Sequence, residues 1–233
     1  MQDHFPNLQK TVFIVTYGRS GSTLVQNLLN ALPGACIRGE NDNLLGPLAR
    51  AWDMLRYSPQ SIKMRDETLV TDPADPWFGF EEATSDRFGE ALARAFTETF
   101  LRPGPKTRIA GFKEIRWHND PLLFPIMLDF LRAYFPKAHI LFNLRNHAAV
   151  CRSGWWKTMK PEVVQRQLQQ AEALYAAYGG RNPDACLTLR YENYVTGPDA
   201  WRPLFEFLDE PFDADLVHKV LARKLTHLKP VKG

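Results

Sequence analysis

Short apolar runs alternate along the chain with longer segments in which apolar residues recur at helical spacing. Thr11 to Thr16 is a run of β-branched and aromatic residues followed by a turn rich in Gly and Ser, which is typical of a buried strand. Ser22 to Leu32 has apolar residues three or four positions apart, and Pro33-Gly34 ends this predicted helix. The pattern predicts further strands at 108–113, 138–144 and 185–189, and further helices at 44–55, 85–101, 121–134, 146–157, 161–178, 199–208 and 213–225.

This alternation predicts the fold class. Strands separated by helices at this spacing form βαβ units, so we expect a three-layer α/β domain whose central sheet is mainly parallel. Pro103–Pro105 is a tempting domain boundary, but the strands on either side fit one sheet, so residues 1–233 are expected to form a single domain. Residues 57–80 are rich in Pro, Asp and Ser with little periodicity, which predicts a long loop.

Composition narrows the class of protein. The 45% of apolar and 24% of charged residues are ordinary for a globular domain. Lys and Arg number 29 against 26 Asp and Glu, and the net charge of +3 excludes a strongly basic nucleic-acid coat and an acidic tail. The three cysteines form no CxxC pair, which excludes a disulfide scaffold and the common cysteine zinc sites.

The chain carries no recognisable targeting or membrane signal. Its first ten residues are polar and lack the basic-then-apolar order of a signal peptide. Leu122 to Phe135 is the most apolar stretch, but it is too short and too polar to span a bilayer. We therefore expect a cytoplasmic protein without a nucleic-acid or membrane partner, and the oligomeric state stays open.

The strongest chemical signal is the loop between the first strand and the first helix, in VFIVTYGRSGSTLVQNLL. Its glycines let the backbone approach an anion, and the helix that follows offers free N–H groups and a favourable dipole. Arg19 adds a charge that can grip oxyanions, and Ser22 and Thr23 add hydroxyl donors. A Walker A loop would have Lys where Ser22 stands, which disfavours kinase and NTPase chemistry. A glycine-rich turn without a ligand is the weaker interpretation.

YGRSGST resembles the 5′-phosphosulfate loop of sulfotransferases that use 3′-phosphoadenylyl sulfate (PAPS), which share a P-loop-like α/β fold. This resemblance implies that Arg19, Ser20, Gly21, Ser22 and Thr23 bind the phosphosulfate, and that Arg19 also takes part in catalysis.

The family's second anchor is an Arg at the end of a later strand with a Ser eight residues on. HILFNLRNHAAVCRSGWW supplies Arg145 and Ser153, which the resemblance implies hold the 3′-phosphate. Ser153 is expected two turns along the following helix, about 12 Å from its start. The two tryptophans that follow, Trp155 and Trp156, either stack on adenine or line the acceptor site, or belong to the core.

Two further motifs resemble the protein-tyrosine and bacterial carbohydrate branches of the family. Glu40 in CIRGEND matches their proposed base, which takes the proton of the acceptor hydroxyl. Lys113 in AGFKEIRW matches their catalytic Lys, which neutralises charge on the leaving oxygen. Glu114 is a candidate salt-bridge partner whose side chain should point away from that of Lys113, and the role of Arg116 is open. His118 is the alternative base, because many cytosolic sulfotransferases use a His.

Near the C-terminus, Tyr191-Glu192 resembles a YE pair that helps to hold the nucleotide, and Lys229 in HLKPVK matches a nucleotide-binding Lys of the tyrosine-sulfating branch. The GxxGxxK segment of larger cytosolic sulfotransferases is absent. Residues 42–105 carry no matching motif and are expected to build the acceptor pocket.

The resemblance implies a PAPS-dependent sulfotransferase that acts on a hydroxyl acceptor. A carbohydrate or small natural product is favoured, and a tyrosyl acceptor is kept as an alternative. No HExxH pair or carboxylate cluster is apparent, so no metal is expected. A degenerate P-loop nucleotide or small-molecule kinase is the alternative enzyme, and a nonenzymatic nucleotide-binding module comes third.

Overall fold

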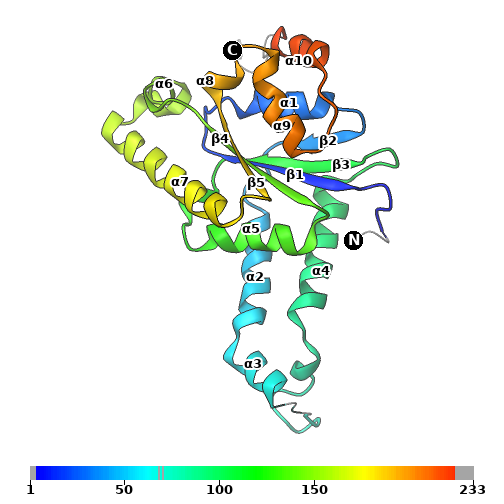
Figure 1. Cartoon of the computed structure of the whole chain (residues 1–233). Coiled ribbons are helices and arrows are strands. Elements are labelled where there is room, and N and C mark those ends of the chain that lie inside the picture. The colour runs from blue at the N-terminus through cyan, green and yellow to red at the C-terminus, as the bar shows by residue number, and fades with distance from the viewer. Residues whose placement is uncertain (1–3, 68, 70, 224–233) are drawn as a thin grey trace, which may run out of the picture.

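The computed structural model describes residues 4–67, 69 and 71–223 and builds them around a five-stranded sheet (Figure 1). The strand order is β2–β3–β1–β4–β5, and every neighbouring pair is parallel. The strands are β1 (Lys10–Thr16), β2 (Ala35–Arg38), β3 (Ile109–Glu114), β4 (Ala138–Leu144) and β5 (Cys186–Arg190). Because all five run the same way, their carboxyl ends meet at one edge of the sheet.

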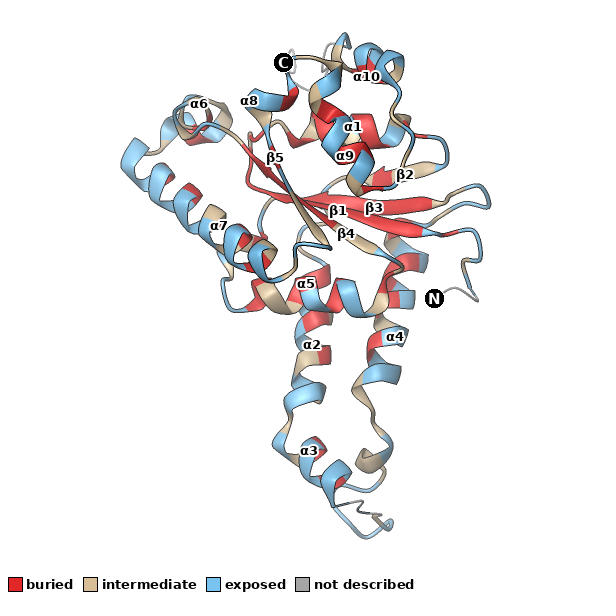
Figure 2. Ribbon diagram, in the orientation of Figure 1, coloured by how far each residue is buried: buried red, intermediate tan, exposed pale blue. Residues whose placement is uncertain are grey.

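Helices cover both faces of this sheet, so the predicted three-layer α/β fold is confirmed (Figure 2). One face packs against α1 (Ser22–Ala31), α9 (Arg202–Phe207) and α10 (Ala214–Leu221). The other packs against α2 (Leu45–Tyr57), α4 (Ser85–Phe96), α5 (Leu123–Tyr134) and α7 (Pro161–Arg181). The side chains of β1 alternate between the two cores: Phe13 and Val15 enter one, and Val12 and Ile14 enter the other.

The remaining helical segments are short. They are α3 (Pro59–Asp66), α6 (His147–Cys151), α8 (Tyr191–Tyr194), a π-helical turn (Thr97–Leu101), and 3₁₀ turns at Phe80–Glu82, Trp117–Asn119, Gly154–Thr158 and Pro198–Trp201. In the part of the chain that the structure describes, no helix combines the length and apolar character needed to cross a membrane.

The sequence pattern missed the edge strand β2. Its four residues are too few to show an alternating pattern, and side chains of α1 complete its hydrogen bonding. The Asn30 side chain donates to the Ile37 carbonyl at 2.9 Å and accepts from the Ile37 N–H at 2.7 Å. These contacts tie the segment that leads into Glu40 to the helix behind the loop of β1.

Two other expectations about elements were wrong. Residues 57–80 are not one long loop, because α3 forms inside them, with Ser58 capping its first turn and Pro59 at its start. In Figure 1, α2 and α4 run side by side away from the sheet as an arm, with α3 at its tip. The helix predicted at 146–157 ends early, since α6 stops at Cys151 and Gly154 takes a left-handed backbone conformation with φ 58°.

Candidate active site

Each of the five strands delivers a candidate residue to the carboxyl edge of the sheet. A cavity of about 370 Å³ at this edge is lined by nine of the site residues predicted from the sequence: Arg19, Gly21, Ser22, Thr23, Glu40, Lys113, Arg145, Ser153 and Tyr191. The alternative base His118 does not line it, and neither does Glu192, which accepts from the Asn146 N–H at 2.9 Å. Ser20 belongs to the same loop as Arg19 but is buried, and its carbonyl accepts from the Asn143 side chain at 3.0 Å. Lys229 lies outside the described residues.

The loop after β1 is shaped by two glycines that each face an aromatic ring. A Cβ on Gly18 would lie 2.2 Å from Trp155 Cζ2, and one on Gly21 would lie 2.3 Å from Tyr191 Cδ2. Gly21 also has φ 87° and is the N-terminal cap of α1. The Trp156 indole N–H donates to the Gly18 carbonyl at 2.9 Å. Because these glycines lack a side chain, the rings of Trp155 and Tyr191 can pack directly against the loop, and the loop backbone stays accessible to a ligand.

Arg19 and Ser153 are in direct contact, although 134 positions separate them. Arg19 Nε donates to Ser153 Oγ at 2.9 Å. The expectation that Ser153 lies two turns along a helix is wrong, because this residue follows the end of α6 and has extended backbone, with φ −119° and ψ 135°. The chain turns back there, which brings the second predicted anchor against the first.

Arg145 approaches the same loop from β4. Its Nη1 donates to the Arg19 carbonyl at 3.0 Å, and its guanidinium carbon lies 4.3 Å from the centroid of the Tyr191 ring. Its Nε is buried and finds no hydrogen-bond partner among the described residues, and the same holds for Ser20 Oγ. Within residues 4–67, 69 and 71–223, no carboxylate forms a salt bridge with Arg19 or Arg145. This side of the cavity therefore fits an anionic ligand.

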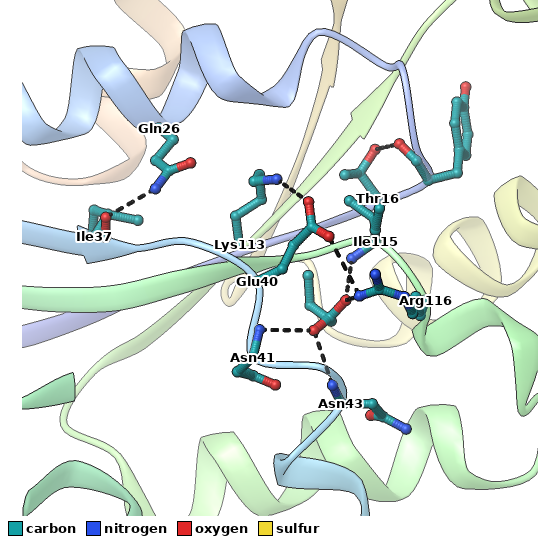
Figure 3. Close-up of polar contacts among 11 residues, drawn as sticks. Thr16, Gln26, Ile37, Glu40, Asn41, Asn43, Lys113, Ile115 and Arg116 are labelled. Carbon is teal, nitrogen blue, oxygen red and sulfur yellow. Dashed lines mark hydrogen bonds and ion pairs between the residues drawn. The ribbon is translucent and has the colours of Figure 1, made fainter. Parts of the chain in front are cut away.

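The opposite side of the cavity holds an ion pair (Figure 3). Lys113 Nζ lies 2.6 Å from Glu40 Oε1, and Arg116 Nη1 lies 3.3 Å from Glu40 Oε2. The Lys113 side chain is 10% exposed and that of Glu40 is 31% exposed. Glu114 does not pair with Lys113; it points to the other side of β3 and pairs with Arg116 at 3.3 Å.

A second cavity of about 420 Å³ adjoins the first and shares Gly18, Glu40, Ile115 and Trp155 with it. Its other lining residues are Arg116, His118, Asn119 and Trp156. Glu40 thus stands where the two cavities meet. Of the two candidate bases, Glu40 lines both cavities and His118 lines only the second.

His118 is largely buried, although it lines the second cavity. Its Nδ1 lies 3.4 Å from the hydroxyl of the buried Tyr175, and burial lowers the pKa of the imidazole to about 4. Burial disfavours the charged form of the ring, so His118 is neutral near pH 7.

Two wall residues, Ile115 and Asn119, were given no role from the sequence. Ile115 and Asn119 are ordinary residues that follow β3, and only their closeness to Lys113 in the chain could have drawn attention to them. Trp155 is 51% exposed and lines both cavities, whereas Trp156 is 6% exposed and serves mainly to pack the loop.

Among the described residues, none between 42 and 105 lines either cavity, so the expectation that this segment builds the acceptor pocket is not supported by these walls.

A further cavity of about 530 Å³ lies at the opposite edge of the sheet. Lys10 and Arg108 both pair with Glu210 there, at 2.9 Å and 2.6 Å, and Asp209 and Asp213 also line this cavity. It therefore offers an anion less than the cavity around Arg19 does. Among the described residues, no group of three or more His, Cys, Asp or Glu side chains is gathered as a metal site requires.

Solved structures similar to this chain share its fold. No curated protein matches the chain. The sulfotransferase domain of the Synechococcus PCC 7002 olefin synthase is 20% identical, with a TM-score of 0.61 over 96% of this chain and 82% of that one. A sulfotransferase domain from the curacin biosynthetic pathway is 17% identical, with a TM-score of 0.54 over 90% and 77% of the two chains. At these identities the likeness shows the fold.

The family comparison covers the site itself. The model of the sulfotransferase family matches residues 11–214, a range that includes all of β1 except its first residue and every described wall of the two cavities. The chain therefore belongs to the sulfotransferase family and is an enzyme of sulfuryl transfer.

Proposed function

We propose that the protein transfers a sulfuryl group from PAPS to a hydroxyl acceptor and releases adenosine 3′,5′-bisphosphate. The observation that carries this proposal is the position of Glu40, which lines both the cavity around Arg19 and Arg145 and the neighbouring cavity. A residue at that boundary can contact a donor on one side and an acceptor on the other. We also propose that residues 1–233 act as a single domain, since the strands on both sides of Pro103–Pro105 belong to one sheet.

On the donor side, the loop N–H groups, the hydroxyls of Ser22 and Thr23, and Arg19 bind the 5′-phosphosulfate at the start of α1. Arg145 and Ser153 bind the 3′-phosphate, and Tyr191 supports Arg145 from below its guanidinium plane. The Arg19–Ser153 hydrogen bond couples the two groups of anion-binding residues. Lys229 remains a predicted ligand of the nucleotide.

Transfer breaks one bond and forms one. The acceptor oxygen attacks sulfur in line, the bond between sulfur and the bridging oxygen breaks, and its electron pair stays on the phosphate of the bisphosphate product. Glu40 accepts the proton of the acceptor hydroxyl, and Lys113 neutralises charge that develops on the bridging oxygen. The 2.6 Å contact between Lys113 and Glu40 supports this division, because both side chains reach the same point of the cavity.

For the acceptor we propose a carbohydrate or a small natural product, bound in the second cavity. The exposed ring of Trp155 and the polar side chain of Asn119 line it, and flat apolar rings beside polar groups suit such ligands. The two similar domains come from an olefin synthase and from a biosynthetic pathway, which favours a small-molecule acceptor over a tyrosyl side chain.

A thermal-shift comparison tests the donor. Adenosine 3′,5′-bisphosphate should raise the Tm of the protein, and ATP with Mg²⁺ should not. Stabilisation by ATP and Mg²⁺ alone would contradict the proposal and favour the P-loop kinase alternative.

A second experiment tests the chemistry. Transfer of labelled sulfate from PAPS to a panel of sugars and hydroxylated natural products should identify an acceptor. Glu40→Gln should then lower kcat about 100-fold or more, whereas Glu162→Gln, at an exposed position of α7, should leave it unchanged. Wild-type turnover in Glu40→Gln would show that another residue, with His118 the next candidate, is the base.

A further inference from the structure

Glu114, the last residue of β3, is a carboxylate with no exposed surface that lines neither cavity. Its Oε2 accepts from the backbone N–H of Asn43 at 3.2 Å and of Asn41 at 3.3 Å, and both of these residues are labelled in Figure 3. Its Oε1 accepts from the Ile115 N–H at 2.8 Å and from Arg116 Nη1 at 3.3 Å. A carboxylate is tolerated at this depth only because its oxygens are satisfied in this way.

The turn that Glu114 contacts has an unusual backbone. Asp42 and Asn43 both lie in the left-handed region, with φ 53° and 61°. Asp and Asn adopt this conformation more readily than most residues with a Cβ, but usually as single residues, so two in succession are uncommon. Successive N–H groups in such turns converge on an anion. Here that anion is the Glu114 carboxylate, which lies inside the protein.

Glu40 is held between this turn and a second attachment point. On the other side of it, Ile37 is bonded to Asn30, and Gln26 Nε2 also donates to the Ile37 carbonyl at 3.1 Å. Lys113 and Glu114 leave opposite sides of β3 and reach the same segment. Lys113 contacts the Glu40 side chain, and Glu114 contacts the backbone just beyond it.

We propose that Glu114 is a positioning residue: it fixes the turn at residues 41–43 and so holds the Glu40 carboxylate where the two cavities meet. This inference rests on the proposed function, because it takes Glu40 as the base. Glu114 also shares Arg116 with Glu40, each at 3.3 Å, and so limits how far Arg116 can draw Glu40 out of the cavity.

Glu114→Gln tests the proposal with little change of shape. An amide offers a single carbonyl oxygen, so its NH₂ must face either the N–H groups of the turn or those of Ile115 and Arg116. We expect kcat to fall at least tenfold, while the Kd for adenosine 3′,5′-bisphosphate stays within twofold and one molecule binds per chain. Amide exchange at residues 41–43 should become at least tenfold faster. Glu162→Gln should alter none of these quantities.

The double variant separates positioning from general damage. If Glu114 acts through Glu40, then adding Glu114→Gln to Glu40→Gln should change the residual kcat by less than threefold. A further tenfold loss in that background would overturn the proposal, and so would a wild-type kcat in Glu114→Gln alone.

A second pair of variants covers the case in which Glu114→Gln does not fold. Valine cannot easily adopt the left-handed conformation and glycine can, so Asn43→Val should lose at least tenfold in kcat and Asn43→Gly should stay within threefold of wild type. Equal kcat values in these two variants would overturn the proposal. Failure of the wild-type protein to bind the bisphosphate would instead contradict the proposed function, and the exchange rates would still report on the turn.

Discussion

The Lys113 ammonium lies 2.6 Å from the Glu40 carboxylate, so the cation and the carboxylate of the candidate site are in direct contact. Lys113 lies in β3, and Glu40 follows the end of β2. These two strands are far apart in the sequence but pair directly in the sheet. Each residue therefore restricts where the other can lie. We expect the two to act in catalysis as a unit.

The first prediction follows from this contact. Lys113→Met should lower kcat about 100-fold, because it removes a preorganised positive charge from the leaving oxygen. The combined Lys113→Met and Glu40→Gln variant should lose much less than the product of the two single effects. Steady-state kinetics of the four proteins measures this coupling, and Lys157→Met, at an exposed position, is the control. Strictly multiplicative losses would show that the residues act independently.

The second prediction concerns the shape of the Arg145 side chain. Its guanidinium lies over the Tyr191 ring and donates to the Arg19 carbonyl, which a lysine cannot reproduce. Arg145→Lys should therefore raise the Kd for adenosine 3′,5′-bisphosphate at least tenfold, equivalent to about 1.4 kcal/mol. Calorimetric titration measures it. Arg152→Lys, an exposed residue that lines neither described cavity, should bind as wild type does. Equal affinities in the two variants would mean that charge alone matters at Arg145.

The third prediction tests the contact between Gly18 and Trp155. A Cβ at Gly18 would overlap the indole ring, so Gly18→Ala should lower the Tm by about 2–12 °C, the range expected for overpacking by about 1–3 kcal/mol. In a Trp155→Leu background the same substitution should cost little, because the obstructing ring is gone. Gly39→Ala serves as a control, since an added Cβ there meets nothing within 4 Å. A loss of Tm that is the same in both backgrounds would place the strain in the backbone of the loop.

Much of the fold could be predicted from the sequence where local pattern and tertiary structure agree. The runs at 11–16 and 138–144 are apolar, β-rich and buried in the centre of the sheet, and they form β1 and β4 within one residue of their predicted bounds. Strand β2 could not be predicted, because its hydrogen bonds are completed by the side chain of Asn30. Nor could the end of α6, since the fold requires Ser153 to turn back toward Arg19.

The candidate site divides in the same way. Residues inside short motifs, such as Arg19 and Lys113, could be proposed from residue type and order. Glu114 could not be placed, because its role depends on the backbone N–H groups of a turn that lies 71 to 73 positions earlier in the chain. No pattern of side chains in the sequence reports the direction of those N–H groups.

The fourth prediction concerns pH and follows from the burial of His118. Its pKa falls from an ordinary 6.5 to about 4 in the folded protein, because the charged ring would lose its hydration. Between these two values the unfolded chain binds more protons at this residue than the native protein does, so the free energy of unfolding decreases as the pH falls through this range. From pH 7 to pH 5 the loss should be about 2 kcal/mol.

Urea denaturation of the wild type and of His118→Asn at both pH values isolates this contribution. His118→Asn should lose about 2 kcal/mol less than the wild type between pH 7 and pH 5, and His218→Asn, at an exposed position, should behave as the wild type does. The same dependence in all three proteins would mean that His118 is already hydrated in the native state, and its place beside Glu40 as an alternative base would then have to be reconsidered.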